Sequence, residues 1–347
     1  MIEFGPGDPA PEAWQPGRSP AEQRLLAPDH PFLQHGRWRG FADGDELEPA
    51  ARIVASVDPR QRTAAGPLGC LGFATLPPGG SAGDAVTPAA RRVLGAAVNW
   101  LHGQGAVVVR APVQLSTWYG HRVVTGGYPD EGGPPPFPLE PKADRALVAL
   151  LEAGGFSPAH HAVSCLVDPH AVVAQAGPAL TRAAHGGLRD RAIRLDDIDA
   201  ELARLHRLST EIFRGTWGLS EIDLEEFAAI YRAFAGVADA GLIRILEEPG
   251  GAAVGFALGL GSVAGPGPAS PGGPAFVLKT IGVTAEARRR HPGLGAALAA
   301  MVHRTALERG YVAGIHALMA RGSMAHRMSL RWGREIRAYA TFERGLS

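Results

Sequence analysis

Apolar and polar residues follow one another along this chain in two successive series of segments, which meet near residues 170–188. In the first series, unbroken apolar runs predict strands, because a strand covered on both faces carries apolar side chains throughout. Apolar positions three or four residues apart predict helices. The expected strands are Ala51–Val57, Pro67–Leu76, Ala106–Val113 and His161–Val167, and the expected helices are Pro88–Gln104 and Lys142–Ala153.

The second series predicts the order strand, helix, helix, three strands, helix, strand, helix, strand. This order is typical of an α/β (α+β) fold with a mixed sheet, and residues 189–343 have the length of one domain. The expected strands are Arg191–Leu195, Leu242–Glu247, Ala253–Leu260, Phe276–Val283, Val312–Leu318 and Glu335–Phe342. The expected helices are Asp196–Phe213, Leu224–Phe234, Ala296–Arg309 and Ser323–Trp332.

The first series repeats the later part of the second: a strand pair, a helix, a strand, a helix and a closing strand. We therefore expect two related domains, over residues 31–185 and 186–347, preceded by a loosely held, proline-rich arm at residues 1–30. An unrelated α+β domain in the first half is an alternative that the pattern leaves open.

Composition and charge limit the function. The 347 residues carry 34 basic and 34 acidic side chains, and this neutral balance argues against a broad nucleic-acid or membrane surface. No membrane-length apolar run or secretory pattern is present, so we expect a cytoplasmic protein. Cys70 and Cys165 lie in apolar runs and predict buried, reduced thiols. The histidines show no metal-ligand spacing, so no metal site is predicted.

The strongest chemical signal lies after the strand Phe276–Val283, where a basic run precedes the glycine pair Gly293 and Gly295. A helix that begins on glycines leaves its first amides unbonded at the positive end of the helix dipole. Arginines beside it add charge-assisted bonds to phosphate. Those arginines are Arg288, Arg289 and Arg290. The segment predicts a site for a diphosphate at the end of a strand.

Residues Arg290 to Gly295, RHPGLG, match an Arg-x-x-Gly-x-Gly signature, and residues 189–343 thereby resemble the GNAT superfamily of acyltransferases. The resemblance implies two tandem GNAT-like domains, of which the N-terminal copy is degenerate because it has no arginine-glycine loop between Leu76 and Pro88. It also implies acetyl-CoA, or another acyl-CoA, as cofactor.

The resemblance assigns the cofactor-binding residues one by one. Pantetheine would lie along Ile281, Gly282 and Val283, and the pyrophosphate would meet Gly293, Leu294, Gly295 and Ala296 beside Arg288, Arg289 and Arg290. The loop departs from the family in length, since Gly293 follows Val283 by ten positions against about eight in common members. Which arginine meets phosphate is therefore open.

The proton-transfer residues are less well marked. The family pattern Asn-x-x-Ala-x-x-Leu-Tyr overlays Gly322–Ser329, so Ser329 stands where the family has its tyrosine, as a water relay or as a helix-surface or thiol-contacting residue. His316 is a candidate base, or equally a hydrogen-bonded histidine of the sheet. Lys279 interrupts an apolar strand and either faces the cleft or points out at a sheet edge.

Two loops are candidates for the acceptor site. Thr216 and Trp217, in FRGTWGLS, follow the first helix of the second series, where GNAT domains gather the acceptor; Trp217 is either a pocket wall or a packing aromatic. The loop QLSTWY, residues 114–119, either lines a cleft between the domains or caps a helix.

The leading hypothesis is an acyl-CoA-dependent N-acyltransferase, most simply an N-acetyltransferase, in which a small-molecule amine attacks the thioester directly. A Fem-like aminoacyltransferase that uses aminoacyl-tRNA is one alternative, which the neutral charge disfavours. A non-catalytic module that binds coenzyme A is another, which the missing tyrosine favours. We expect a monomer or homodimer.

Overall fold

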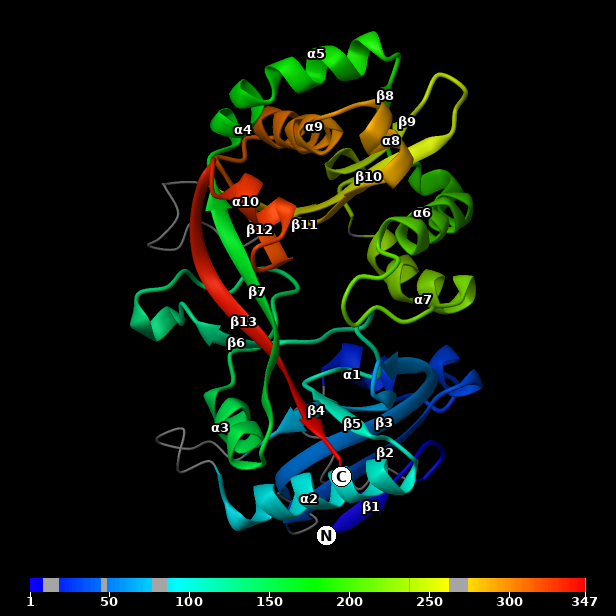
Figure 1. Cartoon of the computed structure of the whole chain (residues 1–347), viewed down its shortest axis with the longest axis vertical. Helices are drawn as coiled ribbons and strands as arrows, with labels where there is room; N and C mark the ends of the chain where they lie inside the picture. Colours follow the sequence, from blue (N-terminus) through cyan, green and yellow to red (C-terminus); the bar gives the residue numbers. More distant parts are fainter. Residues whose placement is uncertain (9–18, 45–48, 77–85, 237, 262–273, 347) are drawn as a thin grey trace.

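The structure is a computed structural model, which describes residues 1–8, 19–44, 49–76, 86–236, 238–261 and 274–346. Over these residues the chain forms an N-terminal and a C-terminal lobe joined by one continuous sheet (Figure 1). The strand order across the sheet is β1-β2-β3-β4-β5-β13-β7-β12-β11-β10-β9-β8, with β6 beside β13. The prediction of an α/β fold with a mixed sheet is confirmed.

The N-terminal lobe consists of antiparallel strands followed by one parallel pair, β4 and β5. Its strands are β1 (Ile2–Phe4), β2 (Arg37–Gly44), β3 (Pro49–Thr63), β4 (Gly66–Thr75), β5 (Val108–Ala111) and β6 (Val123–Gly126). Its helices are α1 (Pro20–Leu25), η2 (Pro31–Gln34), α2 (Pro88–Gly103), η3 (Pro129–Glu131) and α3 (Arg145–Ala153). Helix α2 buries its apolar stripe, including Val93 and Leu101, in the core of this lobe.

The C-terminal lobe has helices on both faces of its sheet. Successive residues of β9 show this division, because Ile245 packs beneath α6 and Leu246 packs beneath α9. Its strands are β8 (Arg189–Ala192), β9 (Ile243–Glu247), β10 (Ala253–Gly261), β11 (Ala275–Val283) and β12 (Ala313–Ala320). Its helical segments are η4 (Leu195–Asp197), α6 (Ile198–Ile212), α7 (Leu224–Ala235), η5 (Ala240–Leu242), α8 (Ala285–Arg290), α9 (Leu294–Glu308) and α10 (Met324–Ser329).

Two long strands connect the lobes and are exchanged between them (Figure 1). Strand β7 (Ser157–Val167) belongs to the first half of the sequence but pairs with β12. Strand β13 (Gly333–Gly345) ends the second half but pairs with β5 as well as with β7. Each half of the chain therefore completes its sheet with a strand from the other half, so the predicted boundary at residue 186 is crossed in both directions.

Several local predictions were wrong. The N-terminal residues are not loose throughout, because Ile2–Phe4 forms β1 against β2 and Phe4 is buried; residues 9–18 lie outside the described part. Strand β5 is shorter than Ala106–Val113, because the proline of a cis Ala111–Pro112 bond follows it. The predicted boundary near residues 170–188 forms two helices, α4 (Pro169–Gln175) and α5 (Gly177–His185).

Candidate functional site

Strands β11 and β12 separate at a level where both are irregular. Their parallel pairing ends with Leu278 opposite His316. The pairing of β10 with β11 skips Lys279, which is therefore the extra residue of a β-bulge. On β12, Leu318 has a φ of 59°, at the point where the pairing with β7 shifts. Among the described residues, no strand pairs with this edge of β11 beyond Leu278.

The open edge of β11 leads to the start of α9. Gly293 takes a left-handed conformation, with φ 90°, and both Pro292 and Gly293 are exposed. Within the described ranges, the amides of Gly293 and Gly295 donate to no backbone carbonyl, whereas those of Leu294 and Ala296 are already bonded. Solvent therefore reaches the predicted diphosphate turn, which offers two of the four expected amides.

The arginines around this turn differ in their partners. The predicted basic turn is a short helix, α8, on which Arg290 pairs with Glu248 at 2.6 Å and with Glu286 at 3.4 Å. Arg288 and Arg289 are exposed, and no ion pair involves them within the described residues. A further arginine, absent from the sequence prediction, lies here: Nη2 of Arg182 on α5 is 2.9 Å from the position of a Cβ at Gly293.

The three residues predicted to face pantetheine lie in different surroundings. Ile281 is half-buried on the α9 face, where it packs against a cluster that includes Ala299 of α9 and Cys165 of β7. Gly282 faces the opposite helix, because a Cβ there would lie 2.7 Å from Ile212 of α6. Val283 is buried in the core beneath α9. Gly282 faces α6 and Val283 lies in the core, so any contact of these two residues with pantetheine would be made by their backbone.

His316 and Ser329 form a buried chain of hydrogen bonds with His303 of α9. Nδ1 of His316 lies 2.7 Å from the Ser329 hydroxyl, and its Nε2 lies 3.1 Å from Nε2 of His303. His303 Nδ1 donates to the Ala299 carbonyl at 2.7 Å, so the chain is consistent when both rings are neutral. Burial holds the pKa of His316 well below its usual value and lowers that of His303 to about 4.

These hydrogen bonds help to distinguish the interpretations offered for His316 and for Ser329. Both nitrogens of the His316 ring are engaged in hydrogen bonds. His316 is therefore a hydrogen-bonded histidine of the sheet rather than a free base. The interpretation of Ser329 as a helix-surface residue is wrong, because its side chain is buried.

Lys279 faces the junction of the lobes. Lys279 lies just beyond the last residue of β11 that pairs with β12, and the charge of Arg122 at the lobe junction acts on it, which favours the interpretation in which it faces the cleft. Burial, and after it the charge of Arg122, lowers the pKa of Lys279 to about 7. Part of the side chain nevertheless remains accessible to solvent. A half-neutral amine at physiological pH can accept a proton.

The two loops singled out in the sequence, one after β5 and one after α6, meet at the lobe junction. The Thr117 hydroxyl donates to the Gly218 carbonyl at 2.8 Å. The Trp118 indole donates to the Ser220 carbonyl at 3.0 Å. The loop after β5 therefore joins the lobes and does not cap a helix.

Trp217 lies among basic side chains at this junction. Its ring stacks on His160 at a centroid distance of 4.3 Å, and the Arg110 guanidinium lies 4.0 Å from the ring centroid. Arg110 is itself paired with Glu343 at 2.6 Å. The neighbouring Thr216 is exposed.

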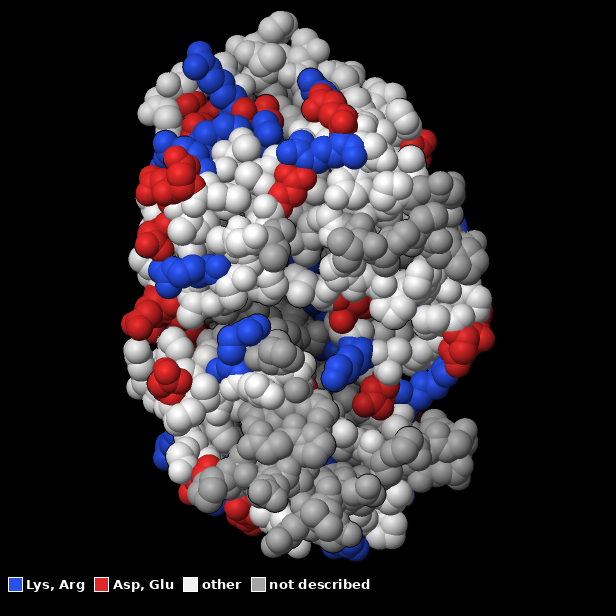
Figure 2. Space-filling model, turned by 180° about the vertical axis from the view of Figure 1, so that it is seen from behind, with Lys and Arg blue, Asp and Glu red and all other residues white. Residues whose placement is uncertain are grey.

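Basic groups gather in a hollow between the lobes. Figure 2 shows this hollow from behind, with Lys or Arg atoms in its depth and at its rim. Four mutually interacting groups lie at the junction: His121, Arg122, His160 and Lys279. No carboxylate is among the charges that act on any of the four. Sequence patterns did not reveal His121 or Arg122, which come from a loop far along the chain from β11.

In the N-terminal lobe, the space between the strands that correspond to β11 and β12 is filled. Strands β4 and β5 also run parallel and then separate. Here, however, Val113 donates its amide to Leu71, and the side-chain oxygen of Gln114 accepts the Phe73 amide at 2.7 Å. A Cβ on Gly72 would lie 2.2 Å from the Val113 carbonyl. The chain itself occupies this gap, as expected of a degenerate copy.

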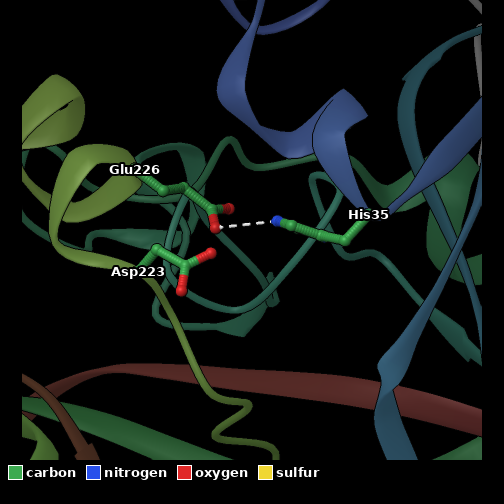
Figure 3. Close-up of side chains that lie close together, drawn as sticks. All are labelled: His35, Asp223 and Glu226. Carbon is green, nitrogen blue, oxygen red and sulfur yellow. Dashed lines mark hydrogen bonds and ion pairs between the residues drawn. The ribbon is translucent and has the colours of Figure 1, made fainter.

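A cluster of acidic side chains with a histidine joins α7 to the N-terminal lobe (Figure 3). His35 lies 3.2 Å from Glu226, and Asp223 lies beside them. The guanidinium of Arg60 is 3.0 Å from Glu226 and 3.2 Å from Asp223. Tyr119 donates to Glu226 at 2.6 Å. Arg60 and the ring of His35 also lie 3.0 Å and 3.2 Å from the buried Asp58, so the cluster is an ion-pair network between the lobes.

Comparisons with known proteins identify the fold. No protein-family model and no curated protein matches the sequence. The structure is similar to a GCN5-related glucosamine N-acetyltransferase region of a fungal multi-domain GH3 β-N-acetylglucosaminidase, with TM-score 0.54 and 12% identity over 90% of this chain and 34% of that one. It is also similar to an Enterococcus faecalis protein of unknown function, a probable N-acyltransferase, with TM-score 0.50 and 10% identity over 94% and 64%.

This chain thus spans about a third of the first protein and just under two thirds of the second. At such low identity the similarity establishes the fold alone. Among the helices of the described residues, none has the length and apolar character needed to cross a membrane.

Proposed function

We propose that this chain, which has the fold of the GCN5-related N-acetyltransferases in tandem arrangement, is an acyl-CoA-dependent N-acyltransferase. The simplest form is an N-acetyltransferase acting on a small-molecule amine. One observation carries the proposal: the unpaired edge of β11, opened by the bulges at Lys279 and Leu318, leads to an exposed turn with unbonded glycine amides. An extended chain with a diphosphate at one end fits such an edge and turn.

The residues of the turn would hold the coenzyme. The amides of Gly293 and Gly295 and the exposed Arg288 and Arg289 are available to phosphate, whereas Arg290 is held by Glu248. Arg182 is directed at the same turn from α5. A bound acyl-CoA supplies the thioester that an amine attacks.

Lys279 would act on the acceptor. An amine arrives in water mainly as its ammonium ion and must lose a proton before it attacks a carbonyl. Lys279 lies where β11 and β12 part, and its lowered pKa leaves about half of its amines unprotonated near pH 7. Lys279 lies close enough to His121 for their charges to interact, and the ring of His121 lies 6.5 Å from that of Trp217. His316 and Ser329 would support the strand and α10 rather than exchange protons.

Replacement of Gly295 by valine tests the coenzyme site. The position is open, with no atom within 4 Å of an added Cβ, so the fold should tolerate Gly295→Val. The side chain would cover the amides that phosphate needs, and we expect acetyl-CoA binding in calorimetry to weaken by at least about 100-fold. Gly95→Val, at an equally open glycine of α2, is the matched control. Unchanged affinity in Gly295→Val would discard the assigned turn.

Turnover is measured separately, as thiol release from acetyl-CoA with a panel of amines. Release that depends on both the amine and Lys279 supports the transferase. Coenzyme binding with no release for any amine would favour a binding module instead.

A further inference from the structure

Arg122 carries a guanidinium without a partner at the junction of the lobes. Its Nε is buried and forms no hydrogen bond, and within the described residues no carboxylate pairs with the group. Its backbone has a φ of 85°, an unfavourable region for an arginine. The residue as a whole is half-buried, so its Nε is shielded while part of the side chain reaches solvent. Leaving a shielded charged group unpaired is costly, and strained positions persist where the surroundings require them. The residue is therefore held in place at a cost that folding alone does not explain.

Two neighbouring polar atoms lack partners as well. Arg122 directly precedes Val123, which pairs with Ala340 of β13. The next residue of β13, Thr341, pairs with His160 of β7. Thr341 Oγ1 and His160 Nδ1 are both buried and without a hydrogen bond. Unsatisfied groups from three adjacent segments of the sheet thus lie together.

At this place the charge of Arg122 has no compensating carboxylate near pH 7, and Lys279 beside it is about half-protonated. Burial lowers the pKa of His160 to about 4 and that of His121 well below its usual value, so both rings are neutral. Arg110 is neutralised by Glu343. Burial lowers the pKa of Arg122 only to about 10, so its charge remains.

We propose that the acceptor amine also carries a carboxylate, which Arg122 binds with His160 as a neighbouring polar group. This inference rests on the proposed function and names the acceptor class: an amino acid or a similarly small amino carboxylate. A single guanidinium matches one carboxylate in charge and in its paired donors, whereas a phosphate monoester carries close to two charges. Lys279 lies near enough for its charge to interact with that of Arg122, so one small molecule can reach both.

The variant Arg122→Asn tests this assignment. Asparagine tolerates positive φ better than arginine, so the substitution should not impair folding. Binding is measured without coenzyme, as the thermal shift produced by each of the common amino acids, by their decarboxylated amines and by phosphoethanolamine. We expect at least one amino acid to stabilise the wild type, and to bind Arg122→Asn about 10- to 100-fold more weakly. The affinity for the corresponding decarboxylated amine should differ much less between the wild type and Arg122→Asn.

A second measurement uses turnover with acetyl-CoA. The ratio of kcat/KM for an amino acid to that for its decarboxylated amine should fall about 10- to 100-fold in Arg122→Asn. Arg92→Asn, at an exposed arginine of α2, should leave the ratio unchanged.

The possible outcomes separate this inference from the proposed function. Amino-acid binding that depends on Arg122, without any turnover, would retain the carboxylate site and refute the transferase. Equal losses for an amino acid and its amine, or no thermal shift with any amino acid, would overturn the carboxylate site. A shift with phosphoethanolamine alone would assign the site to phosphate and also overturn it.

Discussion

Replacing Lys279 by methionine should stabilise the protein at neutral pH while abolishing acyl transfer. In the unfolded chain this amine keeps its proton up to about pH 10.5, whereas in the folded chain its pKa is about 7. Between these values the unfolded state binds more protons than the folded state, so the free energy of unfolding rises with pH across this window. At pH 7 the lowered pKa of Lys279 therefore reduces the stability of the fold. The gap corresponds to about 5 kcal/mol as an upper limit.

The expected gain is smaller than this limit, because part of the Lys279 side chain remains exposed to solvent. We expect Lys279→Met to raise the free energy of unfolding by about 2 kcal/mol at pH 7, and by almost nothing at pH 11. Urea denaturation at a series of pH values measures both numbers. The exposed Lys142 is the only other lysine of the chain, so Lys142→Met is the matched control and should show neither effect.

The same scarcity of lysines allows a direct titration. Competitive labelling with acetic anhydride, read by mass spectrometry, reports the pH at which each lysine becomes reactive, with Lys142 as the internal reference. We expect Lys279 to gain reactivity near pH 7. If its reactivity appeared near pH 10 instead, or if Lys279→Met were less stable than the wild type at every pH, the buried neutral amine would be refuted.

Two further predictions concern buried groups away from the transfer site. Glu226→Gln should lower the free energy of unfolding by about 1–3 kcal/mol, because it weakens the buried bonds from Arg60 and Tyr119, while Arg60 keeps the buried Asp58 as a partner; denaturation beside the exposed Glu225→Gln measures this, and equal stability of the two would contradict an ion-pair network between the lobes. Stability should also fall as the pH drops from 6.5 to 4, and His303, with a folded pKa of about 4, should contribute up to about 3 kcal/mol of that fall, beside the contributions of His121, His160 and His316. His303→Gln should flatten that fall, and an unchanged pH profile would contradict a neutral His303.

Sequence patterns located most of the fold but not its connections. The runs that predicted β11 and α9 became those elements within two residues at each end, because periodicity and glycine boundaries are local signals. Strand β2 was missed because its apolar residues are separated by Arg37, Arg39 and Gly40. The exchange of β7 and β13 has no local signal, since it depends on pairing between distant segments.

The residues of the candidate site likewise divide into those that local sequence patterns reveal and those that they do not. The turn around Gly293 was visible because one short segment carries its arginines and glycines together. Arg122, His121 and Arg182 were not visible, because each lies far along the chain from β11 and next to no motif. Lys279 stood out as a charge within an apolar run, but its direction was set by a bulge that sequence patterns do not reveal.

The placement of β13 affects how the protein is made. Residues 333–345 are inserted between β5 and β7, at the centre of the whole sheet. A ribosome must therefore release almost all of the segments described here before either lobe can close. Until then β5 and β7 each expose an unpaired edge to which another chain can add.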